Sequence, residues 1–294
     1  MLDNTLGILA LFRNESHILE EWIEHHLDQG VDHFYLIDNS SDDDYISIVN
    51  KYNNITIINQ PLVINTGVYW GNILDIQEKS YMDMLPSVNT KWLMIIDIDE
   101  FVYTRNGYHN IKDFLIKNGD NFDQIIFKLK LFNSNNHIIQ PTSVIDGFTS
   151  RVDYNFFYNP LPKSISKTNM IKHITAHFSF LKEGGVTCDD LFEKKTDIFS
   201  KENAKKIDVI DFRNECSICD ENELSNSILV GNHYSVQSED WFFKVKATRG
   251  VCGWPGSEFN EISKYFENYF KKLNNRKRID DFELKTISKR WKNI

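Results

Sequence analysis

Long hydrophobic runs are absent from this sequence of 294 residues. A membrane-spanning helix needs about 20 mostly apolar residues, so we expect none. The segment Met1–Asn4 leads straight into an apolar strand pattern and carries no basic stretch, which argues against a signal peptide. We therefore expect a soluble, cytoplasmic protein without a membrane span.

Cysteine is also scarce, with Cys188, Cys216, Cys219 and Cys252 in the whole chain. So few cysteines exclude a disulfide framework and favour a reducing compartment. Cys216 and Cys219 have the spacing of half a zinc site, but no second pair follows at ligand spacing. Packed thiols are the favoured interpretation.

Positive charge is in deficit, because the chain has 33 Lys and Arg but 42 Asp and Glu, which gives a formal net charge of -9. A surface that follows nucleic-acid phosphates needs excess cations, so we expect no nucleic-acid partner. A phosphate-bearing ligand is still compatible with this charge, because a bound metal ion supplies positive charge locally.

Short apolar runs alternate with helical patterns in the first hundred residues. This alternation predicts parallel βαβ units, hence an α/β, Rossmann-type, mostly parallel sheet that binds ligands at the carboxyl ends of its strands. The predicted strands are Leu6–Phe12, Phe34–Ile37, Ile55–Ile58 and Trp92–Ile96, and the helices are Glu15–Gln29, Tyr45–Tyr52 and Trp70–Leu85.

After Phe101 the pattern becomes α+β, and no linker is long enough to divide the chain. We predict one domain over residues 1–294, with halves at 1–101 and 102–294. The second half is expected to hold strands at Gln124–Phe132, within Lys163–Phe180 and at Leu229–Tyr234, and helices at Ser238–Arg249 and Phe259–Lys272.

Two carboxylates, Asp97 and Asp99, follow the fourth predicted strand. Residues two apart in an extended chain point to the same side. Such oxygen ligands at an open strand end suit Mn²⁺ or Mg²⁺, which keep coordination positions for diphosphate oxygens. The alternative is a solvated acidic turn after a buried strand.

Polar clusters also follow the first and second predicted strands. Asp38 could accept hydrogen bonds from uracil or ribose, although Asn39 and the serines after it suit a plain turn equally well. Arg13 could meet a diphosphate, and Glu15 could favour the start of a helix. The candidate nucleotide contacts at these strand ends are Arg13, Asn14, Glu15, Asp38, Asn39 and Asp97.

These motifs resemble the GT-A fold of glycosyltransferases, above all family 92 and its family 2 relatives. The resemblance covers most of the chain through linked motifs in the family's order. They are RNESHILEEWIEHHLDQGVDHFYLIDNSSDD (13–43), WLMIIDIDEF (92–101), LFNSNNH (131–137), KSISKTNMIKHITAHF (163–178) and NHYSVQSEDWFFKVKATRG (232–250).

The resemblance implies a metal-dependent transferase that moves a hexose from a nucleoside-diphosphate sugar, commonly UDP-linked, to a glycan or other hydroxyl acceptor. Residues 1–101 would bind the nucleotide and 102–294 the acceptor. Inversion and a galactose-like hexose are favoured. The family usually has glycine where Asn133 and Asn136 stand, and Asn tolerates left-handed backbone better than other non-glycine residues.

His233 is the first candidate for a third metal ligand, since neutral imidazole is a competent ligand, and His177 is the second. A histidine satisfied in the core is the alternative for both. Lys163, Lys167 and Arg249 are candidates for phosphate or acceptor binding.

Inverting transfer needs a general base, normally Asp or Glu. Asp240 is favoured, with Glu239 beside it, because both follow His233 closely at a predicted helix start. Asp189, Asp190 and Glu258 stay open, and Trp254 could stack on an acceptor sugar or simply anchor its loop.

Two other functions are compatible with an Asp-x-Asp after a strand. A haloacid-dehalogenase-type phosphatase also carries an Asp-x-Asp after a strand, but there the motif opens the chain and Phe101 would normally be Thr or Val. A catalytically inactive carbohydrate-binding protein of the same fold has no evident need for both Asp97 and Asp99.

Overall fold

The computed structural model describes residues 5–60, 70–156, 161–195, 220–248 and 259–291. A nine-stranded sheet lies at its centre, in the order β3-β2-β1-β4-β8-β6-β12-β5, with β11 also paired to β6. Its strands are β1 Leu6–Phe12, β2 His33–Asp38, β3 Ile55–Asn59, β4 Trp92–Ile95, β5 Glu100–Thr104, β6 Gln124–Leu131, β8 Lys163–Lys167, β11 Thr187–Asp189 and β12 Leu229–His233.

Most neighbours in this sheet are parallel, as the sequence predicts. Strand β1 runs parallel to β2 and β4, and β6 runs parallel to β12 and β11. Two strands run the other way, since β8 is antiparallel to β4 and β6, and β5 is antiparallel to β12. The fold is therefore α/β with a mostly parallel sheet.

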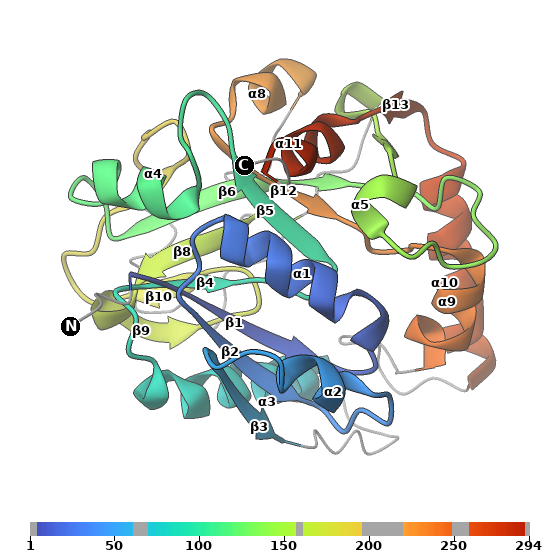
Figure 1. Ribbon diagram of the computed structural model, residues 1–294, viewed down its shortest axis with the longest axis horizontal. Helices are drawn as coiled ribbons and strands as arrows, with labels where there is room; N and C mark the ends of the chain where they lie inside the picture. The colour runs from blue at the N-terminus through green and yellow to red at the C-terminus, as the bar shows by residue number, and fades with distance from the viewer. Residues whose placement is uncertain (1–4, 61–69, 157–160, 196–219, 249–258, 292–294) are drawn as a thin grey trace.

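Helices and two small ribbons surround the sheet (Figure 1). The α-helices are α1 Ser16–Asp28, α2 Tyr45–Val49, α3 Trp70–Met84, α4 Ile111–Asn118, α5 Val144–Gly147, α8 Glu221–Asn226, α9 Glu239–Lys244, α10 Phe259–Asn274 and α11 Glu283–Trp291. The ribbons pair β9 Ile171–Ile174 with β10 Ser179–Leu181, and β7 Ser150–Val152 with β13 Arg278–Asp280. Within the described residues, no helix is long and apolar enough to cross a membrane.

Helix α1 packs on the sheet through the apolar stripe that its sequence predicts. Trp22 and Ile23 are fully buried there, and the indole N–H of Trp22 donates to the carbonyl of Glu100. His25 and His26 are buried on the same face and bond to the backbone of Val102 in β5. Helix α1 is thereby joined to the strand that follows the Asp97–Asp99 motif.

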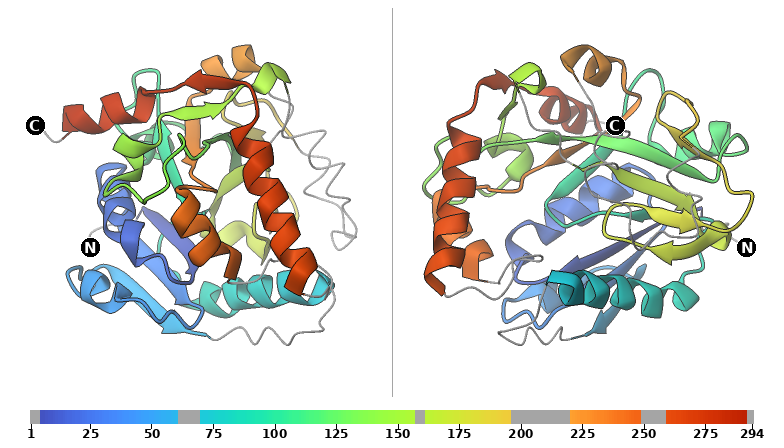
Figure 2. Two further views of the ribbon diagram at one scale, coloured as in Figure 1. Left: turned by 90° about the vertical axis from the view of Figure 1, so that its right-hand side faces the viewer. Right: turned by 180° about the vertical axis from the view of Figure 1, so that it is seen from behind.

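A second apolar cluster joins α9 to α10, which lie side by side in both views of Figure 2. Trp241 and Phe242 of α9 pack with Phe266 and Leu273 of α10. This cluster also contains Leu131 at the end of β6. The C-terminal helices are thus fixed against the end of the central sheet.

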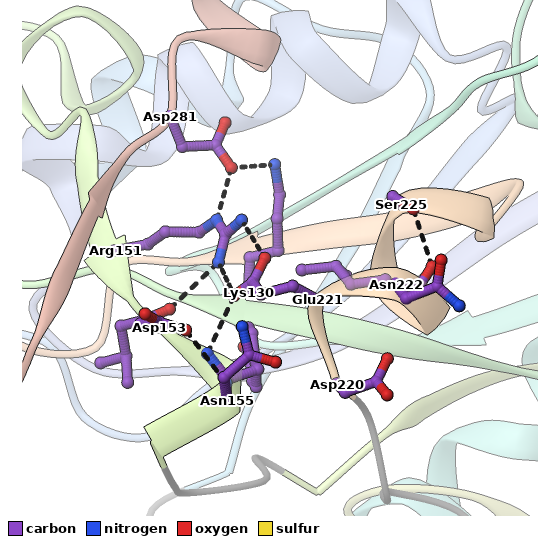
Figure 3. Close-up of polar contacts among 12 residues, drawn as sticks. Lys130, Arg151, Asp153, Asn155, Asp220, Glu221, Asn222, Ser225 and Asp281 are labelled. Carbon is purple, nitrogen blue, oxygen red and sulfur yellow. Dashed lines mark hydrogen bonds and ion pairs between the residues drawn. The ribbon is translucent and has the colours of Figure 1, made fainter.

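A chain of alternating charges holds the last segment to the sheet (Figure 3). Arg151 of β7 bonds through Nε to Asp281 at 2.7 Å and through its other two nitrogens to Glu221. Lys130 of β6, wholly buried, lies 2.8 Å from the same Asp281 and 3.1 Å from Glu283. Glu283 in turn pairs with Arg105, which completes the charged cluster.

Candidate active site

The loops after β1 and β2 are bonded to one another at the carboxyl edge of the sheet. The backbone N–H of Asn14 donates to the hydroxyl of Ser41 at 2.9 Å, and the N–H of Asp42 donates to Oδ1 of Asn14 at 2.9 Å. Asn14 and Ser40 both have positive φ, at 53° and 57°. Asn39 joins the loops again, because its N–H donates to the carbonyl of Phe12.

Asp38, a candidate nucleotide contact, is wholly buried within this edge. Its carboxylate accepts hydrogen bonds from the N–H of Ser41, the hydroxyl of Tyr45 and the side-chain amide of Asn59. In this arrangement Asp38 organises the loop after β2.

Arg13 differs from Asp38, because its guanidinium has no hydrogen-bond or ion-pair partner in the part of the chain that the structure describes, and its Nε is buried without one. Parallel β1 and β4 are in register with Leu9 opposite Ile95, so Arg13 and Asp97 follow their strands at the same edge. Glu15 is buried and precedes α1 as its N-cap residue, without a side-chain capping bond.

The Asp97–Glu100 segment is a turn, so the expectation that Asp97 and Asp99 continue an extended strand is wrong. The N–H of Glu100 donates to the carbonyl of Asp97 at 3.1 Å, and the N–H of Asp97 donates to Oε2 of Glu100 at 3.0 Å. The N–H of Tyr234 fixes the turn further by donating to the carbonyl of Asp99. The chain reverses here because β5 returns beside β12.

Lys163 of β8 lies beneath this turn, almost fully buried. Its ammonium group is 3.0 Å from Oδ2 of Asp97, 3.2 Å from Oε2 of Glu100 and 3.1 Å from the carbonyl of Ala176. Burial disfavours the charged form, yet Asp97 and Glu100 hold the pKa of Lys163 above its ordinary value. Burial raises the pKa of Glu100 to about 7 despite the nearby Lys163.

Asp99 is also nearly buried and has two cationic neighbours. Nε2 of His233 lies 3.4 Å from its Oδ1, and Nζ of Lys246 lies 2.6 Å from its Oδ2. Although burial opposes the charged form, Lys246 and His233 hold the pKa of Asp99 well below its ordinary value. Asp99 and Glu100 likewise hold the pKa of His233 above its ordinary value, against its burial.

The two candidate histidines both lie near the turn. His233 ends β12 directly beside Asp99. His177 lies close enough to Asp97 and Lys163 to feel both charges, and burial, followed by the charge of Lys163, lowers its pKa to about 3. Its buried Nδ1 has no hydrogen-bond partner among the described residues. The lowered pKa favours the neutral form of His177, whose Nδ1 is left without a partner inside the described structure.

The contact of Lys246 with Asp99 is not predicted from the sequence, because 147 positions separate the two residues. It follows α9, in the short 3-10 turn Lys246–Thr248, and its ammonium lies 5.6 Å from the ring centroid of Trp241. The motif that ends at Gly250 includes this lysine, but nothing in its spacing indicates a contact with the Asp97–Glu100 turn.

The candidate bases lie at the start of α9. Asp240 is half-exposed and pairs with Lys244 at 2.6 Å, and Glu239 is exposed beside it. Their backbone N–H groups donate to the carbonyls of His137 and Ile138. Neither carboxylate contacts the Asp97–Glu100 turn within the described structure.

The other candidate site residues either bond to other parts of the protein or lie outside the described residues. Asp190 is buried and accepts from the N–H groups of Ile228 and Leu229, while Asp189 pairs with Lys195. Lys167 pairs with Asp123. Cys188 is a buried free thiol. Arg249, Cys216, Cys219, Cys252, Trp254 and Glu258 lie outside the described residues.

The donor chemistry of this edge fits a hard divalent cation. Asp97 is the more exposed carboxylate, with 40% of its side chain accessible. His177, whose Nδ1 is unpartnered in the described structure, is close enough to interact with the charge of Asp97. Carboxylate oxygens and neutral imidazole are suitable ligands for Mn²⁺, and carboxylates for Mg²⁺. Among the described residues, however, no three His, Cys, Asp or Glu side chains are already grouped as a metal site.

A mostly parallel sheet with an Asp-x-Asp turn at its carboxyl edge is typical of the GT-A class of glycosyltransferases. Within that class, the sequence model of glycosyltransferase family 92 matches residues 8–294. The chain belongs to this family. The family resemblance seen in the sequence motifs is confirmed.

Among curated proteins, the chain is similar to a glycosyltransferase family 92 protein of Ricinus communis, at 27% identity over 127 residues. The match covers 42% of this chain and 21% of the plant protein, so the chain spans about a fifth of that relative's length.

Two solved structures are similar at low level. Glucosyl-3-phosphoglycerate synthase from Mycobacterium tuberculosis, in complex with Mn²⁺ and UDP-glucose, has 15% identity and a TM-score of 0.28 over 44% of each chain. The 4-diphosphocytidyl-2C-methyl-D-erythritol synthase from Anaerococcus prevotii has 13% identity and a TM-score of 0.32, over 56% of this chain and 72% of that one.

Proposed function

We propose that this glycosyltransferase is metal-dependent and transfers a hexose from a nucleoside-diphosphate sugar, UDP-linked, to a hydroxyl group of a glycan or other acceptor. The observation that carries the proposal is the Asp97–Glu100 turn. It presents two carboxylates beside His233 and His177, at the edge where Arg13 follows β1.

Asp97 and Asp99 would hold Mn²⁺ or Mg²⁺, with His233 or His177 as the third ligand. When bound, the cation would neutralise the negative charge that develops on the leaving nucleoside diphosphate. Lys163 holds Asp97 in place from below, because its three contacts keep the carboxylate on one side of the turn. Arg13 is placed to bind the diphosphate, since its guanidinium has no partner in the described structure.

The nucleoside would lie near the loops after β1 and β2, where Asn14, Asn39 and the neighbouring backbone line the sheet edge. Asp38 supports this loop through its three hydrogen bonds, and we assign it a positioning role for the nucleoside. Glu15 precedes α1 in the same region, and its backbone carbonyl accepts from the N–H groups of Ile18 and Leu19.

Transfer with inversion requires one carboxylate to take the proton of the acceptor hydroxyl. Asp240 is our candidate, with Glu239 as its neighbour, because α9 leads directly from the His233 loop to Lys246 at Asp99. Glu239 and Asp240 then belong to the acceptor side of the site, in the half formed by residues 102–294.

Calorimetric titration of UDP, with and without Mn²⁺, tests the proposal. We expect Mn²⁺-dependent binding that Asp99→Ala weakens by more than about 100-fold, since even loss of a residue that only supports a ligand costs about 10- to 100-fold. Thermal unfolding should show that the variant still folds. A donor screen with sugar release then identifies the hexose.

Three results would contradict the proposal. UDP binding that is independent of metal and without turnover would favour an inactive carbohydrate-binding protein. Release of inorganic phosphate from simple phosphomonoesters would favour a phosphatase. Full retention of Mn²⁺-dependent UDP binding in Asp99→Ala would remove Asp99 from the metal site.

A further inference from the structure

The contact between Lys246 and Asp99 places a protein cation on a carboxylate that the proposed function assigns to a metal ion. Nζ of Lys246 lies 2.6 Å from Oδ2 of Asp99, and His233 lies 3.4 Å from the other oxygen. Asp99 is only 4% exposed, so both of its oxygens face these partners and little solvent reaches them. The carboxylate is already neutralised by the chain itself.

A divalent cation on Asp99 cannot coexist with the ammonium at this distance without strong like-charge repulsion. The lysine is the group that can move. Its ammonium is carried on a flexible four-carbon stem with three rotatable donors, and a quarter of its side chain is exposed. The face of Trp241, 5.6 Å from the ammonium, offers a further favourable surface beside Asp99.

We propose that Lys246 neutralises Asp99 until a divalent cation binds there, and that it then contacts the diphosphate of the donor. This inference rests on the proposed function. The diphosphate brings negative charge to the same place as the metal, so the displaced ammonium keeps an anionic partner. Lys246 therefore opposes binding of the metal alone and favours binding of metal and nucleotide together.

This coupling has a measurable thermodynamic signature. If Lys246 resists the cation alone, its removal tightens the binding of free Mn²⁺. If it contacts the diphosphate, its removal weakens the binding of UDP to the metal-loaded protein. The two effects have opposite signs, and loss of a merely structural residue would not produce both.

The experiment uses Lys246→Met and, as the matched control, Lys244→Met. Lys244 lies two residues away on α9, is exposed and pairs with Asp240, so its replacement removes the same charge without touching Asp99. Mn²⁺ binding is measured by electron paramagnetic resonance of the free ion. UDP binding is measured by calorimetry at saturating Mn²⁺, corrected for the Mn²⁺–UDP complex in solution.

We expect Lys246→Met to bind Mn²⁺ about 10-fold more tightly and UDP about 10-fold more weakly than the unmodified chain, within the usual range of coupling between two sites. Lys244→Met should change neither value. Should Lys246→Met fail to fold in a thermal scan, Lys246→Gln replaces it.

Unchanged or weaker Mn²⁺ binding in the variant overturns the proposal while the metal site itself stands. Tighter Mn²⁺ binding with unchanged UDP binding overturns the contact with the diphosphate. If the unmodified chain binds no Mn²⁺, the metal dependence in the proposed function fails, and this inference fails with it. If it binds Mn²⁺ but not UDP, only the uridine assignment fails, and the Mn²⁺ titration still tests Lys246.

Discussion

Three acidic side chains of one turn, Asp97, Asp99 and Glu100, are matched by cations that come from distant parts of the chain. Lys163 forms ion pairs with Asp97 and Glu100, and Lys246 forms one with Asp99. The buried pair, Asp99 and Glu100, needs such partners because an unpaired charge in the interior is costly. The sequence indicates the carboxylates by their position after a strand. It cannot indicate the pairing, which depends on how residues far apart in the chain meet.

The same limit applies to Asp38 and Arg13. The sequence places both at strand ends, and the structure agrees. Whether a polar side chain faces a ligand or its own loop depends on local hydrogen bonds that composition does not reveal. Asp38 accepts bonds from Ser41, Tyr45 and Asn59, whereas Arg13 has no partner in the described residues.

Replacing Asp240 with Asn tests the general base. If Asp240 takes the acceptor proton, the variant loses about 10²- to 10⁴-fold in kcat, because that is the usual contribution of a positioned base. Mn²⁺-dependent UDP binding should stay unchanged, since Asp240 contacts Lys244 and not the Asp97–Glu100 turn. Steady-state kinetics and calorimetry on the same preparations separate the two effects.

Glu239→Gln is the matched control, since Glu239 is the exposed neighbour on the same helix turn. A full kcat in Asp240→Asn together with a large loss in Glu239→Gln would assign the base to Glu239. Full activity in both variants would exclude the start of α9 from the proton transfer.

At the scale of elements, apolar periodicity predicts the parallel part of the sheet well. The predicted strands that became β1 to β4 agree with the structure within two residues at each end. Strand β5 escaped prediction, because Glu100–Thr104 follows β4 so closely that the turn between them has no Gly or Pro to mark it. Helices α4 and α11 escaped as well, since they are short and flanked by polar residues.

The loop after β6 shows where a local rule succeeds. Asn136 has φ of 60°, a left-handed conformation that Asn tolerates and that glycine adopts freely. Its neighbour Asn135 is also left-handed, at 50°. Asn133 is not among the residues with positive φ, and its side chain bonds instead to Ser150. Asn136 therefore takes the left-handed backbone conformation that glycine would adopt, whereas Asn133 does not and is held by its side-chain hydrogen bond.

Helix α1 is joined to β5 by two histidines that must stay neutral. His25 donates to the carbonyl of Val102, and Nε2 of His26 accepts from the N–H of the same residue, so a proton on His26 would break that bond. Burial lowers the pKa of His25 from 6.5 to about 4 and that of His26 well below its ordinary value. The unfolded chain therefore binds more protons than the folded chain between pH 6.5 and 4.

Stability should consequently be full above pH 6.5 and fall as the pH drops toward 4. The shift at His25 alone corresponds to about 3 kcal/mol over this range. Urea unfolding of His25→Gln, which cannot titrate here, should show a loss smaller by roughly 2–3 kcal/mol between about pH 7.5 and about pH 4.5. His109→Gln, at an exposed histidine, serves as control, and identical pH profiles for all three proteins would refute the assignment.

For the whole molecule, the charged chain Glu221–Arg151–Asp281–Lys130–Glu283–Arg105 joins five separate segments. Figure 3 shows its members from Glu221 to Lys130. It attaches the last part of the chain to β6, whose neighbour β12 ends in His233. Acids and cations alternate along it and are equal in number. Loss of one inner member therefore leaves an unbalanced charge in the interior.

Asp281→Asn should destabilise the protein by about 3–5 kcal/mol, because an excess positive charge then stays on the wholly buried Lys130 and its neighbours. A double variant that adds Lys130→Met to Asp281→Asn loses that excess charge. It keeps two complete pairs, Glu221 with Arg151 and Glu283 with Arg105. The double variant should therefore be more stable than Asp281→Asn alone, with a coupling energy of at least about 1 kcal/mol. Urea unfolding at neutral pH of both single variants and the double variant measures this coupling. Strictly additive losses would show that the buried charges do not depend on one another, and the C-terminal segment would then be held by apolar contacts instead.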